Sequence, residues 1–253
     1  MMSKINLINH KDRVINLFGD IEEDICKDTI EKIINTNLSD DEYISNAMLT
    51  LNSIGFSTEP ENISLPPITI NLSTFGGDCF TGWGLCDCIR MSATSVKIVC
   101  YGKVMSMGIP ILLSAQHKAA HKNTTFMIHD VSSYTWGKAQ EIKESLDETI
   151  KLRNQYMDYI CDNSKFPRKK FEEIIEKKQD FYFTAEEALK WKFIDEIIDD
   201  EMLNIKNEEV ESNVKSKDKS TKETITTKEE KKGKDKSNKK DKTKKSKTKT
   251  KSK

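Results

Sequence analysis

The stretch at residues 68–115, ITINLSTFGGDCFTGWGLCDCIRMSATSVKIVCYGKVMSMGIPILLSA, alternates twice between a strand pattern and a helix pattern. Short apolar runs at 68–72 and 96–101 predict buried strands. Each run is followed by a turn and then by an apolar segment of helical length, at about 81–91 and 107–115. Strands that alternate with helices pair in parallel, because each helix carries the chain back to the start of the next strand. The stretch therefore predicts an α/β fold.

The flanking segments continue this alternation. Upstream, the pattern predicts a strand at 13–18 and two helices, at 21–34 and 42–51, separated by a polar gap. Downstream, it predicts a strand at 125–128, helices at 138–160 and 168–177, a helix from Thr184 that starts with a capping box, and a closing strand or helix end at 193–198. About 200 residues of this kind are enough for one domain with a full core, which we place at 1–202.

The charges are distributed unevenly along the chain. The sequence holds 41 basic and 41 acidic residues, but 215–253 contains 18 lysines and six acidic residues, so this segment carries +12 and the rest carries −12. Large apolar side chains are almost absent there, so burial cannot offset the entropy lost on ordering. We expect a Lys-rich disordered tail at 203–253. It either contacts nucleic acid or acidic surfaces, with strong salt dependence, or only keeps the chain soluble.

Several functional classes are excluded by missing patterns. No run approaches the ~20 apolar residues of a membrane span, and the N-terminus lacks the apolar run of a secretory signal, so we expect a cytoplasmic protein with no membrane partner. The six cysteines form no C-x-x-C pair, which favours reduced core thiols. No P-loop, dinucleotide fingerprint or complete metal cluster occurs, so we expect neither a cofactor nor a metal in this chain.

Three residues stand where catalytic chemistry is possible. Ser106 lies between a predicted strand and a predicted helix, where free backbone N–H groups favour a developing negative charge. His129 ends the strand at 125–128, and an imidazole there can act as a general base near neutral pH. Asp180 precedes an aromatic run and could orient that imidazole. Taken singly, each also fits an ordinary role, as a capping serine, a structural histidine or a turn aspartate.

Two further pairs of residues have alternative interpretations. Gly76 and Gly77 follow the strand at 68–72, where they either present an amide to an oxyanion or form a simple turn. His117 and His121 have the i, i+4 spacing of a metal site on a helix, but no carboxylate lies nearby in the sequence, so the metal interpretation is weak.

Together, these residues resemble the ClpP family of serine peptidases, the proteolytic subunit of the Clp protease. The likeness covers about residues 10–200. Five segments carry it: the opening strand at 12–19, the strand and diglycine loop at 68–77, the nucleophile motif Ser106-Met107-Gly108, the histidine strand at 126–129, and the segment that begins at Asp180.

The resemblance implies a role for each matching residue. Ser106 would be the nucleophile, His129 the general base and Asp180 its orienting carboxylate. The backbone amides of Gly77 and Met107 would form the oxyanion hole. The implied fold is a spiral of strand–helix units shared with the crotonases.

The resemblance also implies an assembly and a substrate. Family members form stacked heptameric rings that enclose their active sites, and a partner AAA+ unfoldase, not this chain, uses ATP. In that picture the helix at 138–160 resembles the element that joins the two rings. The expected activity is that of a serine endopeptidase that hydrolyses unfolded proteins inside the chamber.

The chain departs from the family pattern in several places, including Val104-Met105 and Pro110 around the nucleophile motif. The segment before Asp12 is shorter than the family's gating segment, an insert lies at about 37–67, and residues 130–137 replace the usual Gln-Pro and glycines after His129. These changes resemble divergent ClpP-like proteins of phages, which would work in the host cytoplasm. They leave two alternatives open: a catalytically impaired ring-forming scaffold, and a phage maturation protease that acts without an ATPase.

Overall fold

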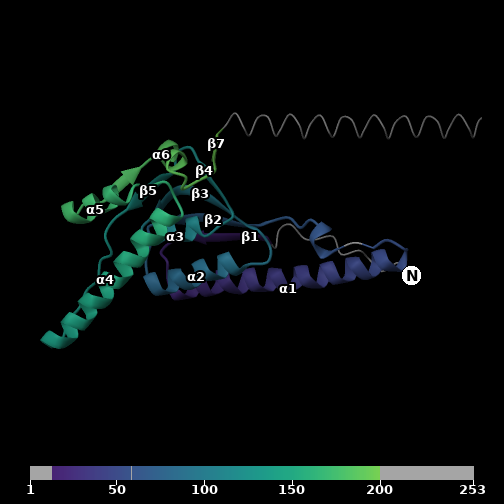
Figure 1. Cartoon of the computed structure of the whole chain (residues 1–253), viewed down its shortest axis with the longest axis horizontal. Helices are drawn as coiled ribbons and strands as arrows, with labels where there is room; N and C mark the ends of the chain where they lie inside the picture. Colours follow the sequence, from purple (N-terminus) through teal and green to yellow (C-terminus); the bar gives the residue numbers. More distant parts are fainter. Residues whose placement is uncertain (1–12, 58, 200–253) are drawn as a thin grey trace, which may run out of the picture. The chain divides into compact units, whose positions relative to one another are not determined.

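A mostly parallel sheet forms the centre of the fold (Figure 1). The structure, a computed structural model, describes residues 13–57 and 59–199. The strands found there are β1 (Val14–Phe18), β2 (Ile68–Thr74), β3 (Val96–Met105), β4 (His117–His121), β5 (Thr125–Ile128), β6 (Phe181–Phe183) and β7 (Glu196–Ile198). They follow the order β1-β2-β3-β4-β7, and β5 pairs with both β3 and β6. Of these pairings only β5–β6 is antiparallel, so the predicted α/β class is confirmed.

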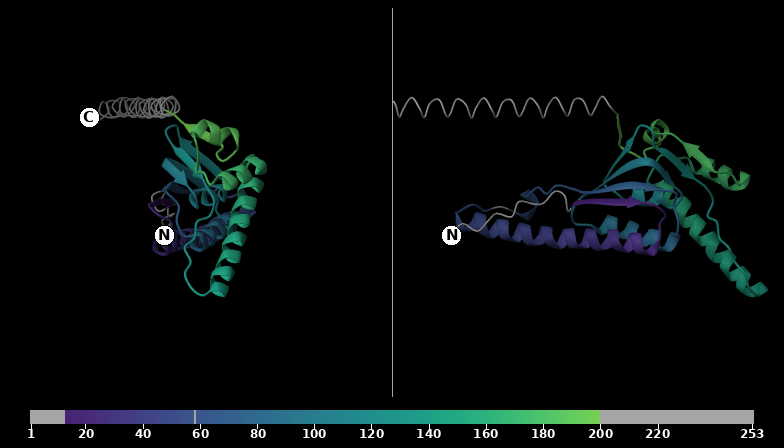
Figure 2. Two further views of the ribbon diagram at one scale, coloured as in Figure 1. Left: turned by 90° about the vertical axis from the view of Figure 1, so that its left-hand side faces the viewer. Right: turned by 180° about the vertical axis from the view of Figure 1, so that it is seen from behind.

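Helices cover the sheet, as the strand–helix alternation predicted. They are α1 (Glu23–Ser53), the short 3₁₀ helix η2 (Pro60–Asn62), α2 (Cys79–Met91), α3 (Gly108–Leu113), α4 (Ala139–Asp162), α5 (Arg168–Lys177) and α6 (Ala185–Lys190). The first turns of α1 and the whole of α2 run beneath β1 to β3, and α4 points away from the sheet (Figure 2). Within the described residues, no helix has the length and apolar character needed to cross a membrane.

Alternating side chains on the inner strands build the core beneath the sheet. Every second residue of β2 is fully buried, namely Ile68, Ile70, Leu72 and Thr74. A fully buried aliphatic side chain stabilises the folded state by about 1.5–3 kcal/mol. β3 lies in the centre of the sheet, so the residue that follows β3 is attached to a strand paired on both sides.

The predicted break between helices at 21–34 and 42–51 is wrong. A single helix, α1, spans both segments, and the first half of the insert at 37–67 is its continuation. The polar gap contains neither Gly nor Pro, so nothing in it interrupts the backbone hydrogen bonds. Its one buried polar residue, Asp40, turns inward instead and has partners in the core.

A buried ion pair fixes the middle of α1 to the start of the sheet. Asp40 accepts hydrogen bonds from the Arg13 guanidinium and from the Thr94 hydroxyl, and both charged side chains are only 5% exposed. Arg13 also donates to the carbonyl oxygen of Pro66 at 2.6 Å. The network therefore joins α1, β1 and the segments that precede β2 and β3.

We expect the substitution Asp40→Ala to lower the free energy of unfolding by about 3–5 kcal/mol, because it leaves the buried Arg13 guanidinium without its counter-charge. Urea denaturation measures the change. The control is Asp41→Ala, which removes the exposed neighbouring carboxylate and should change stability by less than about 0.5 kcal/mol. Equal stability of the two variants would contradict the structural role of the pair.

Two strands were missed in the sequence. His117 and His121 belong to β4, not to a helix. Four strand steps separate their Cα atoms by roughly 13 Å, so they cannot ligate one metal ion. His117 instead contacts Glu196 at 3.0 Å, and the His121 ring lies against Tyr101. The aromatic run after Asp180 forms the second missed strand, β6.

The sequence-based boundary at 202/203, and the Lys-rich tail beyond it, lie outside the described residues.

All six cysteines lie within the described residues, and each is a free thiol. Burial raises the pKa of Cys86 to about 12, and a hydrogen bond with the Ser114 side chain offsets part of that rise. The predicted core position is confirmed for Cys26, Cys86 and Cys100, whereas Cys79, Cys88 and Cys161 are partly exposed.

Candidate active site

Sheet register brings Ser106 next to His129. β3 and β5 run in parallel, with Met105 opposite Met127, so both strands end at the same edge of the sheet. Ser106 follows β3 directly, and His129 follows β5. The amide of Ser106 donates to the carbonyl oxygen of Met127 at 2.9 Å and holds the two strand ends together.

The antiparallel pair of β5 and β6 adds Asp180 to this edge. Ile128 lies opposite Phe181, so the next step of the same register places His129 opposite Asp180. β6 is fixed by ring contacts, including Phe126 against Phe183 with centroids 5.3 Å apart. The structure therefore collects all three predicted side chains from three strand ends that are far apart in the sequence.

Ser106 adopts a backbone conformation that non-glycine residues seldom occupy. Its φ is +50°, in the left-handed region, at the sharp turn from β3 into α3. Such strain persists only where surrounding contacts enforce it, and it concentrates at functional sites. Met107, not Ser106, is the residue that caps α3, so the capping interpretation of Ser106 is wrong. Its hydroxyl contacts His129 instead.

The side chains of Ser106 and His129 form a hydrogen bond. The imidazole Nε2 lies 2.8 Å from the serine Oγ, which suits proton transfer between them. On the other side of the ring, Nδ1 lies 3.8 Å from Asp180 Oδ1, and the Asp180 side chain is 54% exposed. That separation is longer than a hydrogen bond, so Asp180 acts on the imidazole here as a nearby, partly solvated charge.

The diglycine turn after β2 packs directly against the nucleophile. A Cβ on Gly76 would come within 2.6 Å of the Ser106 Cβ, and a Cβ on Gly77 would collide with the backbone of Ile21. Both glycines also have positive φ. The turn is held by the Gly76 carbonyl, which accepts from the Ile21 amide at 2.7 Å. Only glycine permits this approach, so the pair is more than a simple turn.

Two backbone amides remain available at this site. Among the hydrogen bonds of the described residues, none has the amide of Gly77 or of Met107 as its donor. Both residues line the same hollow as Ser106. Free N–H groups beside a nucleophile are the donors that an oxyanion requires.

The hollow at the strand ends has a volume of about 260 Å³. Apolar, aromatic and polar residues line it: Phe75, Gly77, Cys79, Ser106, Met107, Met127, His129, Asp130, Val131, Ser132 and Tyr156. Burial and the nearby Asp78 charge raise the pKa of the Cys79 thiol. Cys79 is therefore protonated at neutral pH and is a poor nucleophile beside Ser106.

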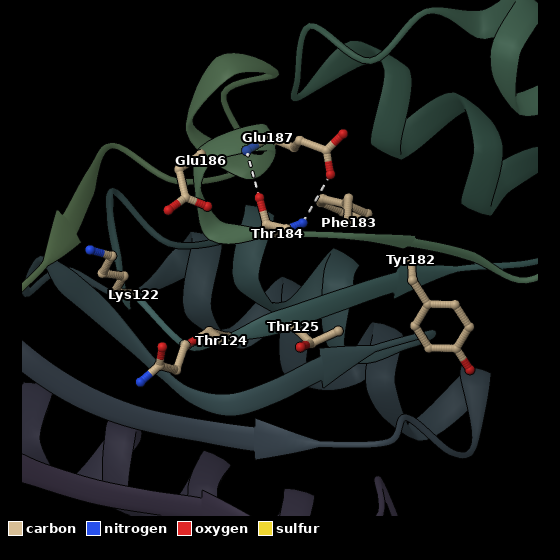
Figure 3. Close-up of a pocket in the computed structure, with 9 residues that line it drawn as sticks. Lys122, Thr124, Thr125, Tyr182, Phe183, Thr184, Glu186 and Glu187 are labelled. Carbon is tan, nitrogen blue, oxygen red and sulfur yellow. Dashed lines mark hydrogen bonds between the residues drawn. The ribbon is translucent and has the colours of Figure 1, made fainter.

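A second hollow, of about 300 Å³, shares no residue with the first. Figure 3 shows its lining, which includes Lys122, Tyr182 and the N-terminal turn of α6. There Thr184 and Glu187 exchange hydrogen bonds, so the predicted capping box is confirmed. Thr184 and Glu187 are thus paired with each other, and none of the predicted site residues lines this hollow.

The described residues contain no group of three or more His, Cys, Asp or Glu side chains arranged to hold a metal ion. The groups that the site offers for chemistry are the Ser106 hydroxyl, the His129 imidazole, the Asp180 carboxylate and the amides of Gly77 and Met107. Tyr156 is the residue of the site that sequence reasoning missed. It reaches the hollow from α4, 50 positions after Ser106. To predict this position, one would have had to know both which face of α4 carries Tyr156 and where α4 packs in the fold.

Comparisons with known proteins identify the family and support the fold. A sequence model of the Clp protease family matches residues 61–201, which is more than half of the chain. The chain therefore belongs to the Clp protease family, a family of peptidases, and the resemblance in the sequence is confirmed.

Individual relatives in the family are distant. Three proteins named ATP-dependent Clp protease proteolytic subunit are 24–29% identical to this chain. The protein from Deinococcus radiodurans is 29% identical over 136 residues, 53% of this chain and 66% of its own. The protein from Bacteroides thetaiotaomicron is 24% identical over 172 residues, with 67% and 75% covered. That from Streptococcus thermophilus is 25% identical over 198 residues, with 76% and 88% covered.

A solved structure shows the same fold. A point mutant of ClpP1 from Listeria monocytogenes superimposes with a TM-score of 0.57 at 23% sequence identity. The match covers 75% of this chain and 93% of that one. The expected ClpP-like arrangement of strand–helix units is therefore confirmed.

Proposed function

We propose that the chain is a serine endopeptidase that hydrolyses peptide bonds of unfolded proteins inside an oligomeric chamber. The observation that carries the proposal is the 2.8 Å hydrogen bond between His129 Nε2 and the Oγ of Ser106, a residue in the left-handed conformation at a strand end. A strained serine paired with an imidazole beside an apolar hollow is the arrangement of an activated nucleophile. Family membership supports the same activity.

Acylation follows from this geometry. The Ser106 Oγ attacks the carbonyl carbon of the scissile peptide, and its proton passes to His129 Nε2. The carbonyl oxygen becomes an oxyanion, which we propose the amides of Gly77 and Met107 bind. The tetrahedral intermediate then expels the amine, which takes the proton from His129. The product is an ester between Ser106 and the acyl half of the substrate.

Deacylation repeats these steps with water. His129 takes a proton from water as the water attacks the ester carbonyl, and then returns it to the Oγ of Ser106 as the carboxylic acid leaves. In both half-reactions the imidazole passes through a cationic state. The Asp180 carboxylate, 3.8 Å from Nδ1, stabilises that cation electrostatically.

We expect the substitution Asp180→Asn to lower kcat about 10²-fold, less than the ~10⁴-fold measured where the aspartate is buried and bonded to the imidazole. The reason is that Asp180 is half exposed and lies beyond hydrogen-bond distance. Steady-state hydrolysis of a fluorogenic peptide gives kcat. A loss as large as that of His129→Ala would contradict this expectation and indicate that the Asp180–His129 contact closes during catalysis.

The assembly is also part of the proposal. Family membership supports self-association into rings, which we propose are heptameric and stacked, and cooperation with an AAA+ unfoldase that consumes ATP. This chain would then need no cofactor, and it would work in the cytoplasm of its cell or, if viral, of the host. α4, which points away from the sheet, is the element that we propose joins the rings.

Two measurements on the full chain test the proposal and its alternatives. Hydrolysis of a fluorescein-labelled unfolded protein tests the activity, and native mass spectrometry tests the assembly. The proposal predicts both hydrolysis and a multiple of seven subunits. Rings without hydrolysis would favour an impaired scaffold. Hydrolysis of phage assembly proteins, with no stimulation by an AAA+ unfoldase, would favour a maturation protease.

A further inference from the structure

A tyrosine from α4 contacts the backbone of the nucleophile. The hydroxyl of Tyr156 donates a hydrogen bond to the carbonyl oxygen of Ser106 at 3.2 Å. The same oxygen accepts the amide of Ile109 at 2.9 Å, so two donors hold it. Tyr156 is 4% exposed and packs edge-to-face on Phe171, with ring centroids 5.8 Å apart.

This carbonyl oxygen and the proposed oxyanion donor belong to one peptide unit. The carbonyl of Ser106 and the N–H of Met107 flank the same C–N bond, which is planar and trans, so the two groups point in opposite directions. Fixing the direction of the carbonyl therefore fixes the direction of the N–H. If the carbonyl were released, the plane could rotate and turn the Met107 amide away from the hollow.

The tyrosine is suited to hold this plane permanently. Burial raises its pKa far above the ordinary value, with a smaller contribution from Cys79, so the hydroxyl keeps its proton and remains a donor. The helix that carries it is held one turn further on, where the Tyr159 ring packs edge-to-face on Trp83. The Tyr159 hydroxyl contacts the Ser114 hydroxyl at 2.8 Å.

We propose that Tyr156 is a positioning residue that locks the Ser106–Met107 peptide plane and keeps the Met107 amide directed at the reacting carbonyl. The inference rests on the proposed peptidase function for its effect on rate, but not for the contact itself. It gives α4 a second role besides assembly, because the helix supplies a hydrogen bond that preorganises the oxyanion donors.

The test compares Tyr156→Phe with Tyr159→Phe. Both variants remove one hydroxyl from the same face of the same helix, but only the first removes a bond to Ser106. We expect Tyr156→Phe to lower kcat about tenfold with KM little changed, because the amide acts in the transition state and not in substrate binding. Affinity for a peptide boronic acid, whose tetrahedral adduct occupies the oxyanion position, should fall by a similar factor. Tyr159→Phe should leave all three values unchanged.

A second measurement is independent of catalysis. Hydrogen exchange of the Ile109 amide reports whether its acceptor, the Ser106 carbonyl, stays in place. Tyr156→Phe should speed this exchange, and Tyr159→Phe should not. If the wild-type protein hydrolyses no peptide, the proposed function fails, while the exchange rate still decides the role of Tyr156. Equal exchange and equal kcat in the two variants would overturn the inference.

Discussion

The substitution Ser106→Ala is expected to lower peptide hydrolysis by roughly 10⁶-fold, the loss seen when a serine protease loses its nucleophile. The covalent route disappears with the Oγ, and His129 is left without a group to activate. Hydrolysis of a fluorogenic peptide measures the effect. The fold should survive, because alanine is smaller than serine and the backbone bonds of residue 106 remain.

A matched control distinguishes the loss of the nucleophile from a loss of activity caused by misfolding or by sample preparation. Ser39→Ala removes an exposed hydroxyl on α1, which bonds only its own helix, and it should hydrolyse the peptide at the wild-type rate. Far-UV circular dichroism should match for both variants. Residual hydrolysis by Ser106→Ala above about 1% of the wild-type rate would point to a different nucleophile, because the expected loss is far larger.

The substitution His129→Ala should be almost as damaging, with an expected loss of about 10⁶-fold in kcat. Without the imidazole, the Ser106 hydroxyl loses the one acceptor that the described part of the chain places within hydrogen-bond distance. The two residues act as one unit, so the double variant Ser106→Ala with His129→Ala should be no slower than either single variant. Measuring all three rates in parallel gives this comparison.

A histidine outside the site provides the control for that series. His121→Ala removes a ring that contacts Tyr101 on the sheet, and kcat should stay within about twofold of wild type because the change lies outside the site. Additive losses in the Ser106 and His129 double variant would contradict their operation as a unit. A His129→Ala variant with wild-type kcat would remove the general base from the mechanism.

The strand positions were predictable because buried strands leave short apolar runs. The residues of β5 matched their predicted range, and β1, β2 and α2 were within two residues of theirs. β4 was missed because His117-Lys118-Ala119-Ala120-His121 has no apolar run, and its strand form depends on pairing with β3 and β7. β6 has only three residues, too few for a periodic pattern.

The length of α1 was not predictable from its own residues. The polar gap at 35–41 looks like a loop in the sequence, and it is helical because Asp40 finds Arg13 and Thr94 in the folded core. These partners are distant in the sequence, so no local pattern reveals them. Tertiary contacts therefore override the local signal here.

The candidate site was predictable in its residue types and order but not in its geometry. The resemblance to a known family selected Ser106, His129 and Asp180, whereas the 2.8 and 3.8 Å separations follow from the register of β3, β5 and β6. Tyr156 could not be found this way, because its hydroxyl acts on a backbone oxygen. Such a contact leaves no side-chain motif.

Reaction of the purified full chain with a fluorophosphonate tests the central claim most directly. The reagent forms a bond from phosphorus to an activated serine Oγ and releases fluoride, and peptide mapping by mass spectrometry locates the adduct. The account predicts one adduct per chain, on Ser106, which is absent in Ser106→Ala and formed far more slowly in His129→Ala. An unlabelled protein, or an adduct on any residue other than Ser106, would contradict it.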